Sequence, residues 1–153
     1  MISEIVLAAG CFWSVQYKFS KLKGVIETKA VYAGGNVDNP TYKEVCSGST
    51  NHAEAVYIKY DTDIISTREL LVYFFKIHDA TQFHRQGPDV GSQYRSAIFY
   101  FDEEQRKIAE SVINELQNTI YYRNAKIVTE IEKISKYYIA EDYHQDYYKK
   151  KGY

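Results

Sequence analysis

The residues best suited to chemistry in this chain are a cysteine and the two aromatic residues that follow it, Cys11, Phe12 and Trp13. The apolar run before them predicts a buried strand, and residues 11–21 show the apolar spacing of a helix, with Gly10 as the turn between the two. A cysteine in the first helical turn lies near unpaired backbone N–H groups and the positive end of the helix dipole, and both favour the thiolate. The position therefore predicts that Cys11 is a nucleophile. The alternative is a cysteine that only packs as a small hydrophobic residue.

A single acidic residue, Glu54, stands at the beginning of an otherwise apolar strand pattern over residues 53–60. Burial disfavours the charged carboxylate and raises its pKa, so a buried glutamate can donate a proton near neutral pH. The alternative is a glutamate on an edge strand that faces water. The pattern alone leaves both interpretations open.

The run His52-Ala53-Glu54 also matches the first half of a zinc deaminase signature. The second half needs a Pro-Cys-x-x-Cys motif downstream, and no cysteine follows Cys46. We therefore predict no metal site. The remaining histidines are expected to be hydrogen-bonded or at the surface: His78, His84 and His144.

The segment 89–96 is rich in turn-forming and polar residues and follows Gly87-Pro88. It delivers polar side chains, among them Asp89 and Tyr94, to the beginning of a strand, and loops of this kind often carry function. The alternative is that Asp89 and Ser92 satisfy the backbone of a turn while Tyr94 only packs.

Strands and helices alternate along the chain around these residues. Strand patterns occupy residues 5–9, 25–32, 53–60, 96–101 and 128–134. Helical patterns cover residues 11–21, 66–77 and 102–118, and the last two begin at the capping residues Ser66 and Asp102. Helices that cover one side of a mixed sheet make a two-layer α+β sandwich, and the order of elements favours a ferredoxin-like plait.

Length and composition narrow the class of protein. The chain has 153 residues, which fits one domain spanning 1–153. Nineteen basic residues against twenty acidic ones give a formal charge of −1, so neither nucleic acid nor an anionic membrane is indicated as a partner. Two cysteines are too few for a secreted disulfide framework, and no stretch reaches the length of a membrane span. We therefore expect a cytoplasmic protein.

Taken together, these motifs resemble those of the A-type peptide methionine sulfoxide reductases. The matching blocks run in order through nearly the whole chain: Gly10-Cys11-Phe12-Trp13, Tyr32-Ala33-Gly34-Gly35, Asn39-Pro40-Thr41-Tyr42, Val45-Cys46-Ser47-Gly48, His52-Ala53-Glu54, Arg85-Gln86-Gly87, Asp89 to Ser96, and Ala140 to Gln145. Chance agreement of so many blocks in one order is not credible.

The resemblance implies thiol-dependent reduction of the S epimer of methionine sulfoxide, free or in peptides and proteins, with no bound metal or organic cofactor. It implies that Cys11 attacks the sulfoxide sulfur and becomes a sulfenic acid, while Glu54 protonates the departing oxygen. Phe12 and Trp13 would hold the substrate methyl group, which agrees with the preference of a methyl-bearing sulfur for aromatic walls. The polar pocket would be completed by Tyr42, Tyr94 and Asp89.

The chain departs from the family pattern at several positions. Ser14 and Gln16 stand where glycine and glutamate are common, and His84 stands where asparagine is common. Loss of the charge at Gln16 is expected to alter electrostatics or stability rather than to abolish activity. Asn51 replaces a usual glycine, and asparagine tolerates a left-handed backbone better than other non-glycine residues.

Recycling of Cys11 is a further departure, because many relatives carry resolving cysteines in a C-terminal tail and no cysteine follows Cys46 here. Either Cys46 resolves the sulfenic acid, which requires Cα atoms within about 7 Å, or an external reductant does so. The external reductant would be glutathione with glutaredoxin, or thioredoxin. We favour the external route because free cysteines such as Cys46 are usually packing residues.

Two other functions stay open on the sequence alone. A sulfoxide-binding or redox-sensing module would keep the pocket and turn over poorly. Another cysteine enzyme, an acyl transferase or hydrolase, would pair the thiol with a histidine base. The aromatic residues and Glu54 favour the sulfoxide reductase.

Overall fold

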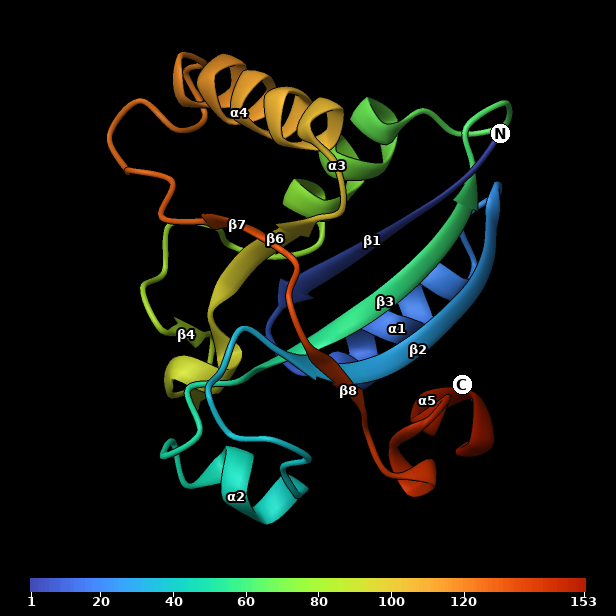
Figure 1. Ribbon diagram of the computed structural model, residues 1–153. Helices are drawn as coiled ribbons and strands as arrows, with labels where there is room; N and C mark the ends of the chain where they lie inside the picture. Colours follow the sequence, from blue (N-terminus) through green and yellow to red (C-terminus); the bar gives the residue numbers. More distant parts are fainter.

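A six-stranded sheet in the order β7-β6-β1-β3-β2-β8 forms the centre of the computed structural model, which describes residues 1–153 (Figure 1). Its strands are β1 (Ile2–Ala9), β2 (Val25–Ala33), β3 (Ala53–Asp61), β6 (Ser96–Tyr100), β7 (Glu130–Lys133) and β8 (Tyr137–Ile139). A separate hairpin consists of β4 (Arg85–Gln86) and β5 (Asp89–Val90). The helices are α1 (Phe12–Ser20), α2 (Tyr42–Cys46), α3 (Thr67–Lys76), α4 (Glu103–Gln117) and α5 (Tyr147–Lys150).

The sheet is mixed, as the sequence predicts. Neighbouring strands are antiparallel in every pair except β6 and β7, which run parallel. The five predicted strands all exist, with ends displaced by at most three residues. The predicted helices are found as α1, α3 and α4. Five short elements were not predicted: α2, β4, β5, β8 and α5.

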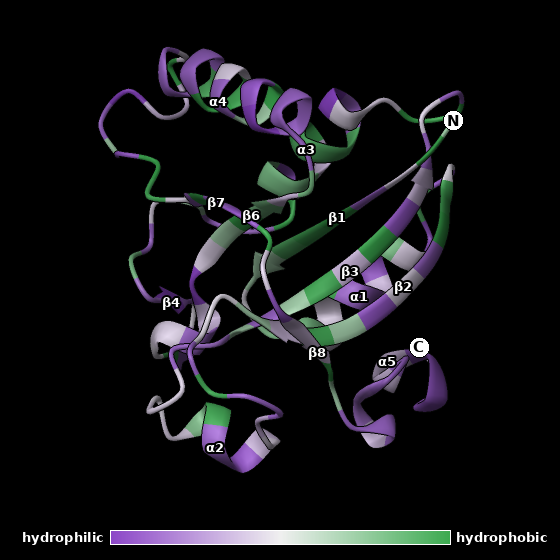
Figure 2. Ribbon diagram, in the orientation of Figure 1, coloured by the Kyte–Doolittle hydropathy of each residue, from purple (hydrophilic) through white to green (hydrophobic).

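The two faces of the sheet are covered differently. Residues such as Leu7 and Ile58 face a large apolar core shared with α1, α3 and α4. The other face carries a smaller cluster that includes Val6 and Ala55, and it is covered by residues such as Tyr137 from the chain around β8. Figure 2 shows the hydrophobic residues concentrated in the central strands β1 and β3, whereas α5 is hydrophilic. The molecule is therefore a two-layer structure with its helices on one face.

Local sequence signals fix the beginnings of the helices. The Ser66 hydroxyl accepts a hydrogen bond from the Glu69 N–H, and the Glu69 carboxylate accepts one from the Ser66 N–H, so α3 begins with a capping box. Asp102 caps α4 by accepting from the Gln105 N–H at 2.8 Å. Asn51 has φ of 59°, which confirms the expected left-handed backbone.

The turn from β1 into α1 requires glycine. Gly10 has φ of 99°, and a Cβ atom at this residue would lie 2.9 Å from Cγ of Gln86. Only glycine combines this conformation with such close packing. The turn sets Cys11 at the junction between the end of β1 and the beginning of α1.

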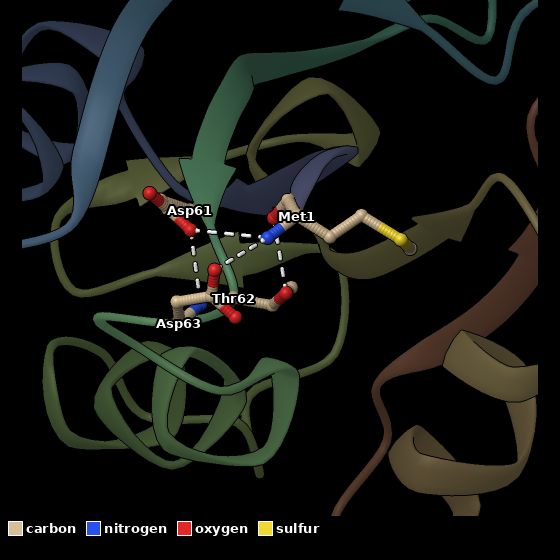
Figure 3. A network of polar contacts seen from close by, with 4 residues as sticks. All are labelled: Met1, Asp61, Thr62 and Asp63. Atoms are coloured by element: carbon tan, nitrogen blue, oxygen red, sulfur yellow. Dashed lines mark hydrogen bonds and ion pairs between the residues drawn. The ribbon is translucent and has the colours of Figure 1, made fainter.

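The opposite end of β1 is held by exposed charges (Figure 3). The amino group of Met1 donates to Asp61 at 3.3 Å and to Asp63 at 3.0 Å, and the Met1 carbonyl accepts from the backbone N–H of Thr62 at 2.8 Å. These contacts join the beginning of β1 to the end of β3. None of the helices has the length and apolar character needed to cross a membrane.

Candidate active site

Cys11 is the N-terminal capping residue of α1, half-buried and not disulfide-bonded. The pKa of its thiol is raised to about 11, mainly by burial and to a smaller extent by the carboxylates of Glu54 and Asp89. Hydrogen bonds from the backbone N–H groups of Trp13 and Ser14 act in the opposite direction. The sequence-based expectation of a thiolate at this position is therefore wrong for the substrate-free protein. The increase in pKa caused by burial is larger than the decrease caused by the backbone N–H groups at the beginning of α1.

Glu54 lies in the core beside Cys11. Glu54 shares a face of β3 with Val56 and Ile58, and its carboxyl group points toward the beginning of α1. Glu54 is only 1% exposed. The backbone N–H of Phe12 donates to Oε1 at 3.3 Å, whereas Oε2 has no partner. Burial is the main cause that raises the Glu54 pKa to about 8. The predicted burial of Glu54 is confirmed, and the alternative of a water-facing glutamate is wrong.

Two of the predicted tyrosines approach this carboxyl group from different elements. Tyr42 is the first residue of α2, and Tyr94 ends a short 3₁₀ turn at Ser92–Tyr94. Burial raises the pKa of both hydroxyl groups, and the charge of Glu54 raises both further. Both tyrosines therefore stay protonated and can donate hydrogen bonds.

The β4–β5 hairpin brings the third polar residue, Asp89, to the site. Its charge raises the pKa of Cys11, Glu54 and Tyr94. The hairpin is held against the body of the protein by the Gln86 side chain, which exchanges two hydrogen bonds of 2.9 Å with the backbone of Asp79.

The aromatic residues after Cys11 differ in exposure. The ring of Phe12 is almost completely buried, with its centroid 5.7 Å from that of Tyr32 and 6.4 Å from that of Tyr42. Trp13 is half-buried and stacks on Tyr147, with centroids 3.8 Å apart and planes 9° apart. One face of the Trp13 indole is thus covered by α5, and Phe12 packs into the core beneath the site.

His144 is a site residue to which sequence reasoning gave no role. Its Nδ1 accepts a hydrogen bond of 2.8 Å from Nε1–H of Trp13, so the ring proton is on Nε2, which has no partner. Burial lowers the His144 pKa and keeps the ring neutral. The signal that could have identified this residue is its place in the block from Ala140 to Gln145.

Buried side chains fasten the segment around His144 to the rest of the protein. The Gln145 side chain exchanges hydrogen bonds of 2.8 and 2.9 Å with the backbone of Ala30 in β2. Gln16 donates to the Thr28 carbonyl at 3.3 Å and accepts from the Asp146 N–H at 3.0 Å. The amide at position 16 both donates and accepts, which a glutamate there would not do when ionised.

Histidines elsewhere are occupied by protein groups. His52 accepts from the Gly35 N–H at Nδ1 and donates to the Val37 carbonyl from Nε2. His78 donates to the Phe74 carbonyl, so its Nε2 accepts from the Ser96 hydroxyl. No group of three histidine, cysteine or acidic side chains is arranged to hold a metal ion.

Cys46 ends α2 and is exposed, and it is not disulfide-bonded. Its carbonyl accepts a hydrogen bond of 3.4 Å from Gln93, and burial raises the pKa of its thiol while the Tyr42 hydroxyl opposes that shift. The second thiol of the chain therefore lies near the Tyr42 hydroxyl.

Comparison with known proteins agrees with this geometry. Residues 3–153 match the family model described as peptide methionine sulfoxide reductase. A peptide methionine sulfoxide reductase MsrA from Saccharolobus solfataricus is 52% identical over 147 residues, covering 96% of this chain and 81% of that protein.

Solved structures show the same fold. Mxr1 from Saccharomyces cerevisiae in reduced form superposes with a TM-score of 0.91 at 39% identity, covering 99% of this chain and 88% of that one. Mxr1 in complex with Trx2 superposes with a TM-score of 0.68 at 28% identity, covering 95% of this chain and 84% of that one.

Proposed function

This chain belongs to the peptide methionine sulfoxide reductase family and catalyses thiol-dependent reduction of methionine sulfoxide, and we propose that Cys11 and Glu54 carry out the chemical step. The observation that carries the proposal is the buried carboxyl group of Glu54, which has one oxygen without a partner and lies beside the only thiol at the beginning of α1. An acid kept protonated near neutral pH is what an oxygen leaving a sulfoxide requires.

The reaction balances with these two side chains alone. The Cys11 sulfur attacks the sulfoxide sulfur, and Glu54 gives its proton to the sulfoxide oxygen. The oxygen then moves to the Cys11 sulfur while the bond between the two sulfurs and the sulfur–oxygen bond of the substrate break, and methionine leaves. Glu54 regains a proton from the Cys11 thiol, so a thiol and a sulfoxide become a sulfenic acid and a thioether. Because the Glu54 carboxylate raises the Cys11 pKa, a neutral Glu54 also favours ionisation of the thiol.

The other predicted residues would bind the substrate. The protonated hydroxyl groups of Tyr42 and Tyr94 would donate to the sulfoxide oxygen, which carries partial negative charge. The aromatic rings of Trp13 and Phe12 would hold the methyl group. Asp89 on its hairpin would bind the polar groups around the methionine side chain. We assign the S epimer, free or in peptides and proteins, as the substrate.

We propose that an external reductant returns Cys11 to the thiol and that Cys46 is not the resolving residue. Mxr1 forms a complex with Trx2, which supports a thioredoxin-type protein as reductant here. Glutathione with glutaredoxin is the second candidate. Two free thiols suit a reducing compartment, and we therefore propose a cytoplasmic protein.

We also interpret residues 1–153 as one reductase domain whose central strands form a ferredoxin-like plait. The order β6-β1-β3-β2, with α1 between β1 and β2 and α3 between β3 and β6, supports that interpretation.

The test is a single-turnover reaction with each epimer of methionine sulfoxide and no reductant. Methionine released and thiols remaining are counted per protein. We expect one methionine from the S epimer, none from the R epimer, and a reduced Cys46. Loss of both thiols would make Cys46 the resolving residue. No methionine from either epimer would contradict the assignment of Cys11 and Glu54.

A further inference from the structure

A carboxylate outside the reacting groups joins three parts of the site. Oε2 of Glu141 accepts a hydrogen bond of 2.9 Å from the backbone N–H of Tyr42, and Oε1 accepts one of 2.7 Å from the hydroxyl of Tyr32. Glu141 follows β8, 99 residues after Tyr42 and 109 after Tyr32. The segment after β8 is thereby tied to the first residue of α2 and to the C-terminal end of β2.

The bond to Tyr42 completes the N-terminus of a very short helix. In α2 the Thr41 hydroxyl accepts from the Glu44 N–H, and the Glu44 carboxylate accepts from the Thr41 N–H. The N–H of Tyr42 has no acceptor within the helix, because the first residues of a helix never do. Glu141 supplies that acceptor, and its negative charge strengthens the hydrogen bond.

The same segment also contacts the Tyr42 ring. The ring centroid lies 4.3 Å from that of His144 and stacks on Phe12 with planes 17° apart. The backbone N–H of His144 donates to the carbonyl of Glu141 at 2.9 Å. Residues 141–144 therefore hold both the backbone and the ring of Tyr42, whose hydroxyl is within range of the Glu54 charge.

We propose that Glu141 is a positioning residue for sulfoxide reduction, holding α2 so that the Tyr42 hydroxyl can donate to the sulfoxide oxygen. The inference rests on the role proposed above for Tyr42. Each oxygen of Glu141 has its own partner. Tyr32 is 1% exposed, so without Glu141 its hydroxyl group would be buried without a hydrogen-bond partner.

The first test compares variants by their single-turnover rate with methionine-S-sulfoxide. Glu141→Ala removes both hydrogen bonds and is expected to lower the rate about tenfold, the scale of a small misplacement of a reacting group. Glu141→Gln can accept from Tyr42 N–H with its oxygen and donate to the Tyr32 oxygen with its NH₂, so a rate within about twofold of the parent is expected. Tyr32→Phe, the matched control, leaves the bond to Tyr42 and should also stay within about twofold.

A double-mutant cycle separates positioning from a general effect on the fold. In a Tyr42→Phe background, Glu141→Ala should have no further effect on the rate, since the hydroxyl it positions is gone. An undiminished tenfold loss in that background would overturn the proposal. Were Tyr42→Phe itself as fast as the parent, the role of Tyr42 and this inference would both fail, while the assignment of Cys11 and Glu54 would stand.

Folding is checked by thermal unfolding of each variant. Should Glu141→Ala show no cooperative transition, Glu141→Asp replaces it in the same cycle. Aspartate keeps the charge but is one methylene shorter, which draws its carboxylate away from the Tyr42 N–H that Glu141 bonds at 2.9 Å. The proposal predicts a slower rate for Glu141→Asp that is not seen in the Tyr42→Phe background, and either a parental rate or an equal loss in both backgrounds would overturn it.

Discussion

Polar groups at the two ends of β1 lie in very different environments. At the beginning, the amino group of Met1 and two aspartates form a network in which every group is paired, and all but Asp61 are largely exposed (Figure 3). At the end, Cys11 is half-buried and Glu54 is buried, and one oxygen of the Glu54 carboxyl group has no partner. Ion pairs exposed to water contribute little to the stability of the fold, whereas a buried polar group without a partner destabilises it. Such a group therefore calls for an explanation, and a catalytic role is one.

The largest expected effect is at the thiol. Cys11→Ser should abolish methionine release, because a serine hydroxyl cannot form the sulfenic acid. Cys46→Ser is the matched control and should still release one methionine per protein in a single turnover. The measurement is methionine formed without reductant, and thiol-dependent activity in the Cys11 variant would refute the nucleophile assignment.

Removal of the buried acid should come next. Glu54→Gln keeps the shape and the hydrogen bond to Phe12 N–H but cannot donate a proton, so the single-turnover rate should fall by about a hundredfold or more. Parental kinetics in this variant would move the proton donor to a tyrosine.

The pH dependence sharpens the same point. With a Glu54 pKa of about 8, the acid form is lost as pH rises through 8. The single-turnover rate should therefore fall above pH 8, and Glu54→Gln should lack that fall. A rate that climbs through pH 8 would show instead that formation of the Cys11 thiolate limits the reaction, since its pKa is about 11.

A third titratable group at this end of β1, His78, has both ring nitrogens hydrogen-bonded, and it should affect stability rather than catalysis. The His78 pKa is lowered to about 4 by burial, while the unfolded chain titrates near 6.5. The unfolded state binds more protons between these values, so stability is complete above pH 6.5 and falls by about 3 kcal/mol as pH decreases to 4. Urea unfolding across this range, with His78→Gln as the reference, measures the difference. Equal slopes for both proteins would contradict the prediction.

The smallest effect is expected at the beginning of β1. Asp63→Asn removes one exposed partner of the Met1 amino group and should change the free energy of unfolding by less than about 0.5 kcal/mol. The single-turnover rate should not change. Loss of activity in this variant would mean that the two ends of β1 are coupled, contrary to the independence expected here.

Much of the fold was predictable because its signals are local. Alternating apolar residues predicted the strands, and Ser66 and Asp102 marked helix beginnings through hydrogen bonds that span three residues. The short elements α2, β8 and α5 were missed because a stretch of three to five residues carries too little periodicity, and contacts from distant residues stabilise them. One such contact is the hydrogen bond from the backbone N–H of Tyr42, the first residue of α2, to the distant Glu141.

The chemistry available to this protein can be read from its residues: a cysteine at a strand-to-helix turn, an acid in an apolar strand and the ordered motifs that place the chain in its family. How those groups behave depends on the folded arrangement. Burial, rather than the helix N-terminus, sets the Cys11 pKa, and the pairing of His144 with Trp13 joins residues 131 positions apart. Desolvation and long-range hydrogen bonds depend on which surfaces meet in space, and a linear pattern does not contain that information.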